Sequence, residues 1–145
     1  MTWRSAGFTL VELVTVIVVI GVMTATVIPN LNIDGFRGVA FHDRVVSSLR
    51  YAGRLASSHR RQVCVDFTAE TLALTIDANR DNDCEAPINF AEQDGNVLQS
   101  GNAAIVFTPV PGQLVFQPDG SSVDAQLSIN NDLQITVVGR TGHVF

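Results

Sequence analysis

A single carboxylate stands inside the longest apolar segment of the chain. Glu12 is the only charged residue between Phe8 and Ile28, a stretch of 21 residues without Lys or Arg. A carboxylate in a membrane helix costs roughly 2.5 to 3.5 kcal/mol on insertion scales, and it usually marks a function. Its partner must come from another chain or from a new positive charge, such as the α-amino group that a cut after Gly7 would leave on Phe8.

A second cluster offers oxygen atoms to a cation. It consists of Asp77, Asn79, Asp81, Asp83 and Glu85, which alternate like the ligands of a calcium loop. The pattern is incomplete, because Ile88 and Asn82 stand where such a loop has its last Glu and its sharp-turn Gly. We therefore assign no metal: the sequence predicts an Asx-rich loop, and calcium binding by Asp77, Asn79, Asp81 and Asp83 is the alternative.

The other titratable residues form no catalytic arrangement. His42, His59 and His143 stand apart in the sequence, and there is no nucleophile elbow, phosphate loop or paired-carboxylate spacing. The sequence predicts no catalytic residue and no cofactor, and His59 is interpreted as a residue at the edge of a helix face.

Composition limits the function further. The 145 residues provide length for one hydrophobic core. All nine basic residues are Arg, and 14 acids bring the net charge to −5, which excludes a basic nucleic-acid-binding protein. Charge is also segregated: residues 37–61 hold six Arg and one Asp, a net +5, whereas residues 62–145 hold two Arg and eleven acids, a net −9.

The segment around Glu12 has the length of a membrane span. As a helix, residues 8–28 would reach about 31 Å, the thickness of the hydrocarbon core of a bilayer. A cleaved secretory signal is the alternative, but its apolar stretch would be shorter and would end at a small-residue cleavage site. Arg4 is the only charged side chain before the segment, so the positive-inside rule places the N-terminus in the cytoplasm and the rest outside.

The residues that surround Glu12 carry a family resemblance. Residues 7–13 and the apolar run behind them resemble the processing site of type IV prepilins and type II secretion pseudopilins. The resemblance implies that a prepilin peptidase cuts after Gly7 and methylates the new amine of Phe8. It also implies that Glu12, then the fifth residue, pairs with the N-terminal amine of a neighbouring subunit, and that Gly21 and Pro29 loosen the helix.

An amphipathic helix is predicted over residues 30–61. Apolar and small residues recur there at spacings of three and four, which is typical of a helix face that packs on a sheet. They are Phe41, Val45, Ser48, Leu49, Ala52, Leu55, Ala56 and His59. Arg50, Arg54 and Arg61 fall on the opposite face, where they meet either solvent or the acidic region of an adjacent subunit.

Beyond residue 61 the hydrophobic period changes to two. The predicted strands cover residues 62–67, 71–77, 104–107, 114–116, 125–129 and 133–138, with a last edge strand at 143–145. Turns rich in Gly, Pro and Asx residues separate most of them, so we expect two small antiparallel sheets.

This region extends the resemblance. Residues 49–52, 60–65 and 114–116 are similar to the GspH/FimT branch of pseudopilins and minor pilins. Cys64, Cys84 and the C-terminal residues 135–144 look most like minor subunits of the mannose-sensitive haemagglutinin (MSHA) pilus class. The resemblance implies an α+β fold in which a long N-terminal helix, transmembrane in its first half, packs on a small antiparallel β-domain of two sheets.

Cys64 and Cys84 are the two cysteines of the chain. In a chain exported to an oxidising space such a pair most often forms a disulfide, here between the first strand and the loop after the second. Free thiols and a metal pair are the alternatives, but neither Cys has a His or another Cys at ligand spacing.

Residues 139–142 partly resemble the Gly-Arg tail with which FimT-like minor pilins bind DNA. Gly142 stands where that motif has a second Arg, so Arg140 alone would attract phosphate weakly. A turn before the last edge strand is the preferred interpretation, and DNA binding by Arg140 is the alternative.

These features predict a minor pilin or pseudopilin subunit of the bacterial inner membrane, and no enzyme. Residues 1–7 are the leader peptide, 8–29 the transmembrane and assembly segment, 30–61 the amphipathic helix, and 62–145 a periplasmic β-domain. The expected partners are prepilin peptidase, other pilin or pseudopilin subunits, the inner-membrane assembly platform and the lipid bilayer, without nucleic acid. The filament would be a type IV pilus, an MSHA-like pilus or a type II secretion pseudopilus; a DNA- or surface-binding minor pilin at the filament tip is the alternative function.

Overall fold

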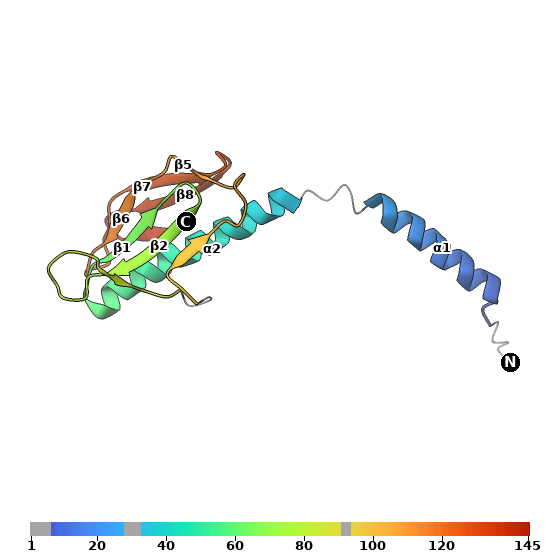
Figure 1. Cartoon of the computed structure of the whole chain (residues 1–145), viewed down its shortest axis with the longest axis horizontal. Coiled ribbons are helices and arrows are strands. Elements are labelled where there is room, and N and C mark those ends of the chain that lie inside the picture. The colour runs from blue at the N-terminus through green and yellow to red at the C-terminus, as the bar shows by residue number, and fades with distance from the viewer. Residues whose placement is uncertain (1–6, 28–32, 91–93) are drawn as a thin grey trace, which may run out of the picture. The chain divides into compact units, whose positions relative to one another are not determined.

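The computed structural model describes residues 7–27, 33–90 and 94–145. The chain divides into two compact units, Met1–Ile33 and Asp34–Phe145. The first contains helix α1, and the second contains nearly all of helix α2 and every described strand (Figure 1). Pro29, which the sequence predicts to weaken the helix, lies outside the described residues.

Helix α1 (Leu10–Val27) begins at a threonine cap. The Glu12 N–H donates to Oγ1 of Thr9 at 3.3 Å, and the Leu13 N–H donates to the Thr9 carbonyl oxygen at 3.2 Å. Thr9 is thus the N-cap and Glu12 the third helical residue, the positions of a capping box. A carboxylate in the first turn is also favoured by the positive end of the helix dipole.

The surface of α1 is apolar and exposed within its own unit. Its exposed large side chains are Leu10, Val11, Leu13, Val14, Val16, Ile17, Val18, Val19, Ile20, Val22 and Met23. Among the helices that the structure describes, none combines the length and the apolar character that crossing a membrane requires.

Helix α2 (Ile33–His59) buries one face. Phe41, Val45, Leu49, Ala52 and Ala56 are each at most 3% exposed and are spaced three or four residues apart, as the sequence predicts. The small residues near the end of this face let the strands approach the helix closely. His59, the last residue of the predicted stripe, is exposed.

The end of α2 corrects the prediction for Arg61. Arg60 adopts a positive φ of 51°, and the Arg61 N–H donates to the Ala56 carbonyl oxygen at 3.2 Å. This is a Schellman ending, which turns the chain away from the helix axis. Arg61 therefore does not share a helix face with Arg50 and Arg54: it is half-buried, and it reaches the loop that follows the second strand.

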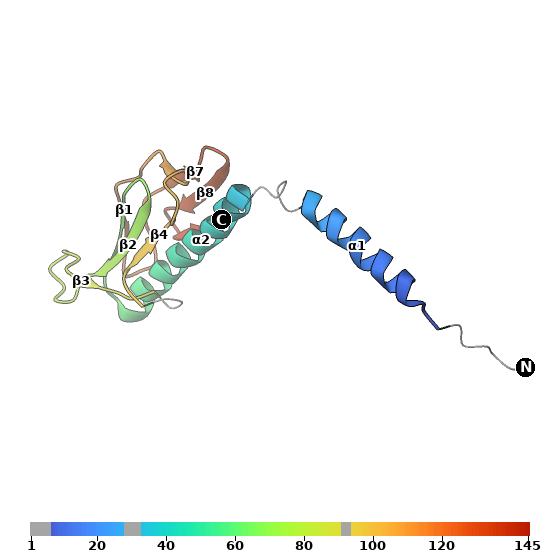
Figure 2. The ribbon, with the colours of Figure 1, turned by 45° about the vertical axis from the view of Figure 1, so that its right-hand side comes forward.

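The larger sheet, sheet A, has five antiparallel strands. Its main order is β3 (Ala86–Pro87), β2 (Thr71–Ile76), β1 (Val63–Phe67), β6 (Gln113–Phe116). Strand β4 (Val97–Gln99) also pairs with β2, at residues 71–73, whereas β3 pairs with residues 75–76 (Figure 2). The two short strands thus share one edge of β2.

The smaller sheet, sheet B, has four antiparallel strands. Its order is β5 (Phe107–Thr108), β7 (Ala125–Ile129), β8 (Leu133–Val138), β9 (His143–Val144). Two helices with two antiparallel sheets confirm the predicted α+β class.

The strand prediction was wrong in one place and incomplete in another. Residues 104–106 are not a strand, because Asn102 holds a turn: its carbonyl oxygen accepts the Ile105 N–H at 2.9 Å and its Oδ1 accepts the Ala104 N–H at 3.0 Å. Strand β5 starts only at Phe107. Strands β3 and β4, of two and three residues, were not predicted because such short segments show no period.

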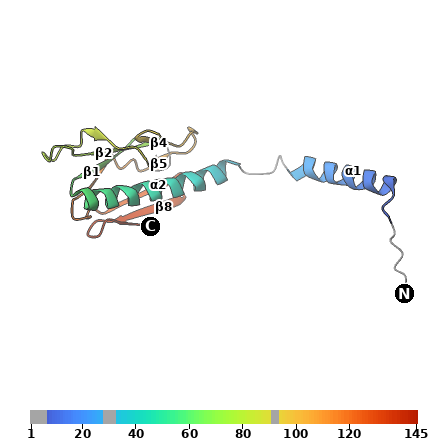
Figure 3. The same cartoon turned by 90° about the horizontal axis from the view of Figure 1, so that it is seen from below.

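The core lies where α2 meets both sheets. Figure 3 shows α2 with β1 and β2 on one side and β8 on the other. The ring of Phe107 lies 5.5 Å from that of Phe41 on α2 and 5.2 Å from that of Phe67 on β1, so it connects the three layers. Every buried apolar residue of the described chain lies between Phe41 and Val144. Residues 34–145 therefore contain a complete core, and we expect them to fold without α1.

Candidate functional site

The predicted cleavage site lies just before α1. Gly7 and Phe8 have no regular secondary structure, and Phe8 is 78% exposed. A side chain at Gly7 would meet no described atom within 4 Å. The fold of the described residues gives no steric reason for a glycine at this position, so a requirement for Gly7 must come from a partner.

Glu12 lies one turn into the same helix and is exposed. Its backbone completes the cap with Thr9, and residues 7–27 contain no basic side chain. No ion pair to its carboxylate is found among the described residues. The carboxylate is therefore available to a positive charge from outside this part of the chain.

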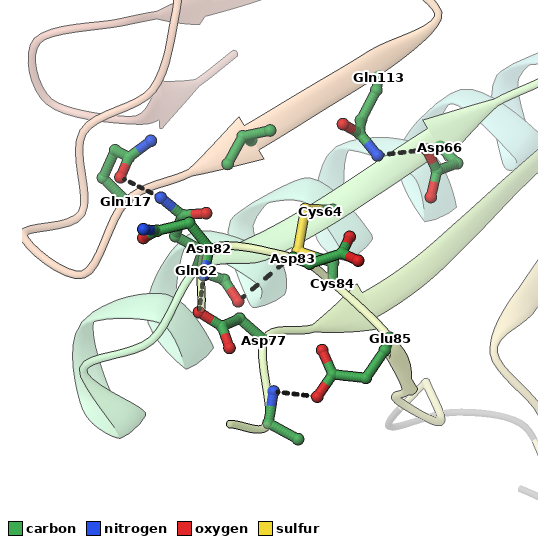
Figure 4. The surroundings of a disulfide bond; sticks show 12 residues. Gln62, Cys64, Asp66, Asp77, Asn82, Asp83, Cys84, Glu85, Gln113 and Gln117 are labelled. Carbon is green, nitrogen blue, oxygen red and sulfur yellow. Dashed lines mark hydrogen bonds between the residues drawn. A yellow bond between two sulfur atoms is a disulfide. The ribbon is translucent and has the colours of Figure 1, made fainter. Parts of the chain in front are cut away.

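The predicted disulfide between Cys64 and Cys84 is present (Figure 4). Cys64 lies at the centre of sheet A, where it pairs with Thr75 of β2 and Val115 of β6, and it is 5% exposed. Cys84 lies in the loop between β2 and β3. The bond therefore ties the 77–85 loop to the middle of the sheet.

Loss of this bond is expected to destabilise the domain. Closing a loop across a sequence separation of 20 is worth about 3 kcal/mol in the chain-entropy description. Cys64→Ala with Cys84→Ala should therefore lower the free energy of unfolding of residues 34–145 by about 3 kcal/mol in urea titrations. Reduction of the unchanged domain is the matched control and should give a similar loss; a loss below about 1 kcal/mol in both would contradict the prediction.

Three acids of the 77–85 loop accept backbone N–H groups. The carboxylate of Asp77, 3% exposed, accepts the N–H groups of Arg80 at 2.5 Å and Asn82 at 3.1 Å. Asp81 accepts the Asp83 N–H at 3.0 Å, and Glu85 accepts the Ala78 N–H at 3.2 Å. These contacts are those of the predicted Asx-rich loop.

The acids that lie close enough to share a cation differ from the predicted calcium ligands. Carboxylate oxygens of Asp77, Asp81 and Glu85 lie within 4.8 Å of one another, and Asp83 is not part of this group. Asn79 donates from its side-chain amide to Asp81 at 3.0 Å. Each of the three carboxylates also accepts a backbone N–H, as in the predicted Asx-rich loop.

Arg61 fixes the base of the loop. Its Nη1 donates to the Ala78 carbonyl oxygen and, at 3.4 Å, to that of Asp77. Together with the disulfide, this contact attaches the loop at both of its ends. Its exposed tip carries Arg80, Asp81 and Asp83.

Residues 139–142 form the turn between β8 and β9. A side chain at Gly139 would lie 2.7 Å from the Ser122 carbonyl oxygen and the Asp124 nitrogen, and one at Gly142 would overlap the Gly120 carbonyl oxygen. Both glycines thus have a packing role in this turn. Arg140 is exposed at its tip.

An open groove of about 970 Å³ lies between α2 and two turns of the β-domain. We call it the arginine groove; its lining includes Arg50, Arg54 and Ser57 of α2, Asp119 of the β6–β7 connection, and Gly142 and His143 of the β8–β9 hairpin. The sequence predicts that Arg50 and Arg54 face outward. It does not predict the groove, because the three segments lie far apart in the chain.

Two arginines and one acid set the charge of the groove. Arg50 donates from Nε to the Val144 carbonyl oxygen at 3.0 Å, and Arg54 donates from Nε to that of Arg50 at 3.3 Å. The hydroxyl and N–H of Ser121 hold the pKa of Asp119 below its usual value, so this carboxylate is ionised at neutral pH.

Two comparisons with known proteins match this chain, one by sequence and one by structure. Residues 4–28 match the prokaryotic N-terminal methylation motif. The structure is similar to the type IV minor pilin FimU of Pseudomonas aeruginosa, with a TM-score of 0.56 at 15% identity over 73% of this chain and 84% of that one. The chain joins a prepilin methylation motif to a pilin-like fold.

A second crystal form of the same FimU supports the pilin-like fold, with a TM-score of 0.53 at 14% identity over 73% of this chain and 89% of that one. No curated protein matches this pilin-like chain in sequence. The motif includes Gly7, Phe8 and Glu12, and the two findings together support the predicted type IV pilin-like family.

Proposed function

We propose that this chain is a minor subunit of a type IV pilus. A prepilin peptidase cuts it after Gly7 and methylates Phe8, and the mature subunit enters the filament through α1. The observation that carries the proposal is the methylation motif over residues 4–28, which includes the exposed apolar helix α1.

The local structure is compatible with cleavage after Gly7. The peptide bond between Gly7 and Phe8 lies outside α1, so a peptidase can bind this segment in an extended form without unfolding the helix. Cleavage also leaves the Thr9 cap in place, because Thr9 and Glu12 both belong to the mature chain.

Cleavage would give Glu12 its partner. The new amine of Phe8 is a positive charge at the end of an apolar helix, and Glu12 is a negative charge one turn away. In lipid or in a helical filament core each of these charges is costly alone, whereas an amine and a carboxylate of neighbouring subunits offset much of that cost together. The pair therefore favours association of mature subunits over uncleaved ones.

We also propose that residues 8–28 hold the subunit in the inner membrane, with the β-domain in the periplasm. This segment is longer than the described helix, since it adds Phe8, Thr9 and Ile28 to residues 10–27. The basic Arg4 before the segment supports this orientation. The disulfide agrees with an oxidising compartment.

A role as a minor subunit is supported by the likeness of this structure to FimU, which is itself a minor pilin. We favour a pilus over a type II secretion pseudopilus for the same reason. The inner-membrane assembly platform and other pilin subunits would then be its partners. Detection of the chain as the bulk component of purified filaments would contradict the minor role.

The intact mass of the protein tests the proposal. We expect the chain from cells with prepilin peptidase to lack residues 1–7 and to carry one additional methyl group on Phe8. The chain from cells without the peptidase should keep its full mass. An uncut chain in both hosts would contradict the proposed function and leave residues 8–28 as an anchor only.

A further inference from the structure

A second hollow, of about 470 Å³, lies between the second half of α2 and the segment that runs from the end of β2 to the residue after β3. We call it the edge hollow. It shares no lining residue with the arginine groove, and all of its lining belongs to the unit Asp34–Phe145. Its volume is within the range of about 300 to 1,000 Å³ that ligand pockets occupy. None of its residues takes part in the proposed function.

One part of the lining is apolar. It consists of Tyr51, Leu55, Ile76 and Ile88, which are half-buried and pack against the core. Apolar side chains that stay partly exposed in a hollow release water when the apolar group of a ligand covers them, and this favours binding. The edge hollow therefore offers an apolar surface to a ligand.

The titratable side chains of the lining are basic, apart from Tyr51. They are His59, Arg61 and Arg80, and no Asp or Glu belongs to the lining. Arg80 is exposed and Arg61 is half-buried. A guanidinium group keeps its charge at every physiological pH and binds carboxylates well. Two such groups beside an apolar surface favour a ligand that carries an anionic group as well as an apolar one.

Both arginines are held by the 77–85 loop before any ligand binds. Nη1 of Arg61 donates to the carbonyl oxygen of Ala78 and, at 3.4 Å, to that of Asp77. Arg80 has a left-handed φ of 69°, which is uncommon for a residue other than glycine, and its N–H donates to the buried Asp77 carboxylate at 2.5 Å. Since the guanidinium of Arg61 and the backbone of Arg80 are already fixed, binding would cost less conformational entropy.

The lining sets two requirements for a ligand within a small volume. The C-terminal residue of a polypeptide meets both at once, because its side chain and its carboxylate leave the same carbon atom. An internal Asp or Glu supplies only the charge and needs a neighbouring residue for the apolar group. A phosphate of a nucleic acid supplies the charge without an apolar side chain to cover Leu55, Ile76 and Ile88.

We infer that the edge hollow binds the C-terminal residue of a different polypeptide, with an apolar side chain and a free carboxylate. The side chain covers Leu55, Ile76 and Ile88, and the carboxylate meets Arg61 and Arg80.

The ligand belongs to a different protein. Phe145 of this chain is held in sheet B, where its N–H and carbonyl oxygen pair with Thr136 at 3.1 and 2.8 Å. The contact also goes beyond the proposed function, since the edge hollow lies in the β-domain and does not depend on cleavage after Gly7.

Binding of short peptides to the full chain in phosphatidylcholine nanodiscs tests the inference by methyl NMR. The probe is an acetylated tripeptide of two glycines and a C-terminal phenylalanine. We expect it to shift the methyl resonances of Leu55, Ile76 and Ile88 in a saturable way. The same peptide with a C-terminal amide lacks the charge and should bind at least about tenfold more weakly. Acetylated triglycine keeps the carboxylate but lacks the side chain, and it should also bind at least about tenfold more weakly.

A substitution in the edge hollow tests the role of its charge. Arg80→Gln removes one guanidinium and keeps the N–H that Asp77 accepts. It should weaken binding of the carboxylate peptide at least about fivefold and leave binding of the amide peptide unchanged. Arg44→Gln is the matched control, because Arg44 is exposed on α2 outside the lining, and it should change neither affinity.

Three results would each overturn the inference. They are equal affinities for the carboxylate and amide peptides, equal effects of Arg80→Gln and Arg44→Gln, and the absence of methyl shifts at millimolar peptide. The comparison of peptides needs no substitution, so it holds even if Arg80→Gln disturbs the loop. The intact mass of the same samples reports cleavage and methylation, so a failure of this contact is distinguishable from a failure of the proposed function.

Discussion

In cells that make Glu12→Ala as their only form of this chain, we expect the mature subunit to be missing from assembled filaments. Under the proposed function, the substitution would leave the methylated amine of Phe8 without its partner in an apolar environment. Removing one member of a buried ion pair costs about 3 to 5 kcal/mol, which corresponds to at least about a hundredfold loss of incorporation. Immunoblots of sheared filaments against membranes measure this ratio.

Two variants separate the charge of Glu12 from its place in the helix cap. Glu12→Gln removes the charge and keeps a side chain that suits the third helical position, so it should fail like Glu12→Ala. Thr9→Ala removes the hydroxyl that accepts the Glu12 N–H and keeps the charge. We expect it to assemble with only a modest loss, because an N-cap is worth about 1 kcal/mol.

Cleavage after Gly7 should proceed in all three variants, and intact mass checks this in the same samples. Normal incorporation of Glu12→Gln would show that the carboxylate is not needed as a charge. Loss of cleavage in Glu12→Ala would instead place the residue in recognition by the peptidase.

The parts of this molecule that could be predicted from sequence are those whose signals are local. The buried face of α2 follows from residues three and four apart, and β1, β2, β6, β7 and β8 follow from alternation along a few residues. The Gly7, Phe8 and Glu12 motif is local as well, since it lies within six residues. Each of these patterns can be recognised from residues that are close together in the sequence, without knowledge of the fold.

The remaining features depend on contacts between distant segments. The arginine groove needs α2, Asp119 and the β8–β9 hairpin together, and no spacing in the sequence indicates that they meet. Arg61 leaves its predicted face because Arg60 takes a left-handed conformation, which favours Gly or Asn over Arg. The Asn102 turn replaces a predicted strand because an Asn side chain competes for backbone N–H groups that a strand would use.

Phe107 provides the strongest test of how the domain is held together. It stands on a two-residue strand, is 3% exposed, and lies against Phe41 of α2 and Phe67 of β1. Phe107→Ala should lower the free energy of unfolding of residues 34–145 by about 3 to 5 kcal/mol, because the cavity opens where three layers meet. Urea titration with the disulfide intact measures this change.

Phe145→Ala is the matched control, since that ring is 58% exposed at the end of sheet B. Its removal should cost less than about 1 kcal/mol, as for most exposed positions. If the two substitutions had equal effects, Phe107 would not connect α2 to both sheets. A larger cost at Phe107 is the result expected of a side chain that packs against α2 and β1 at once.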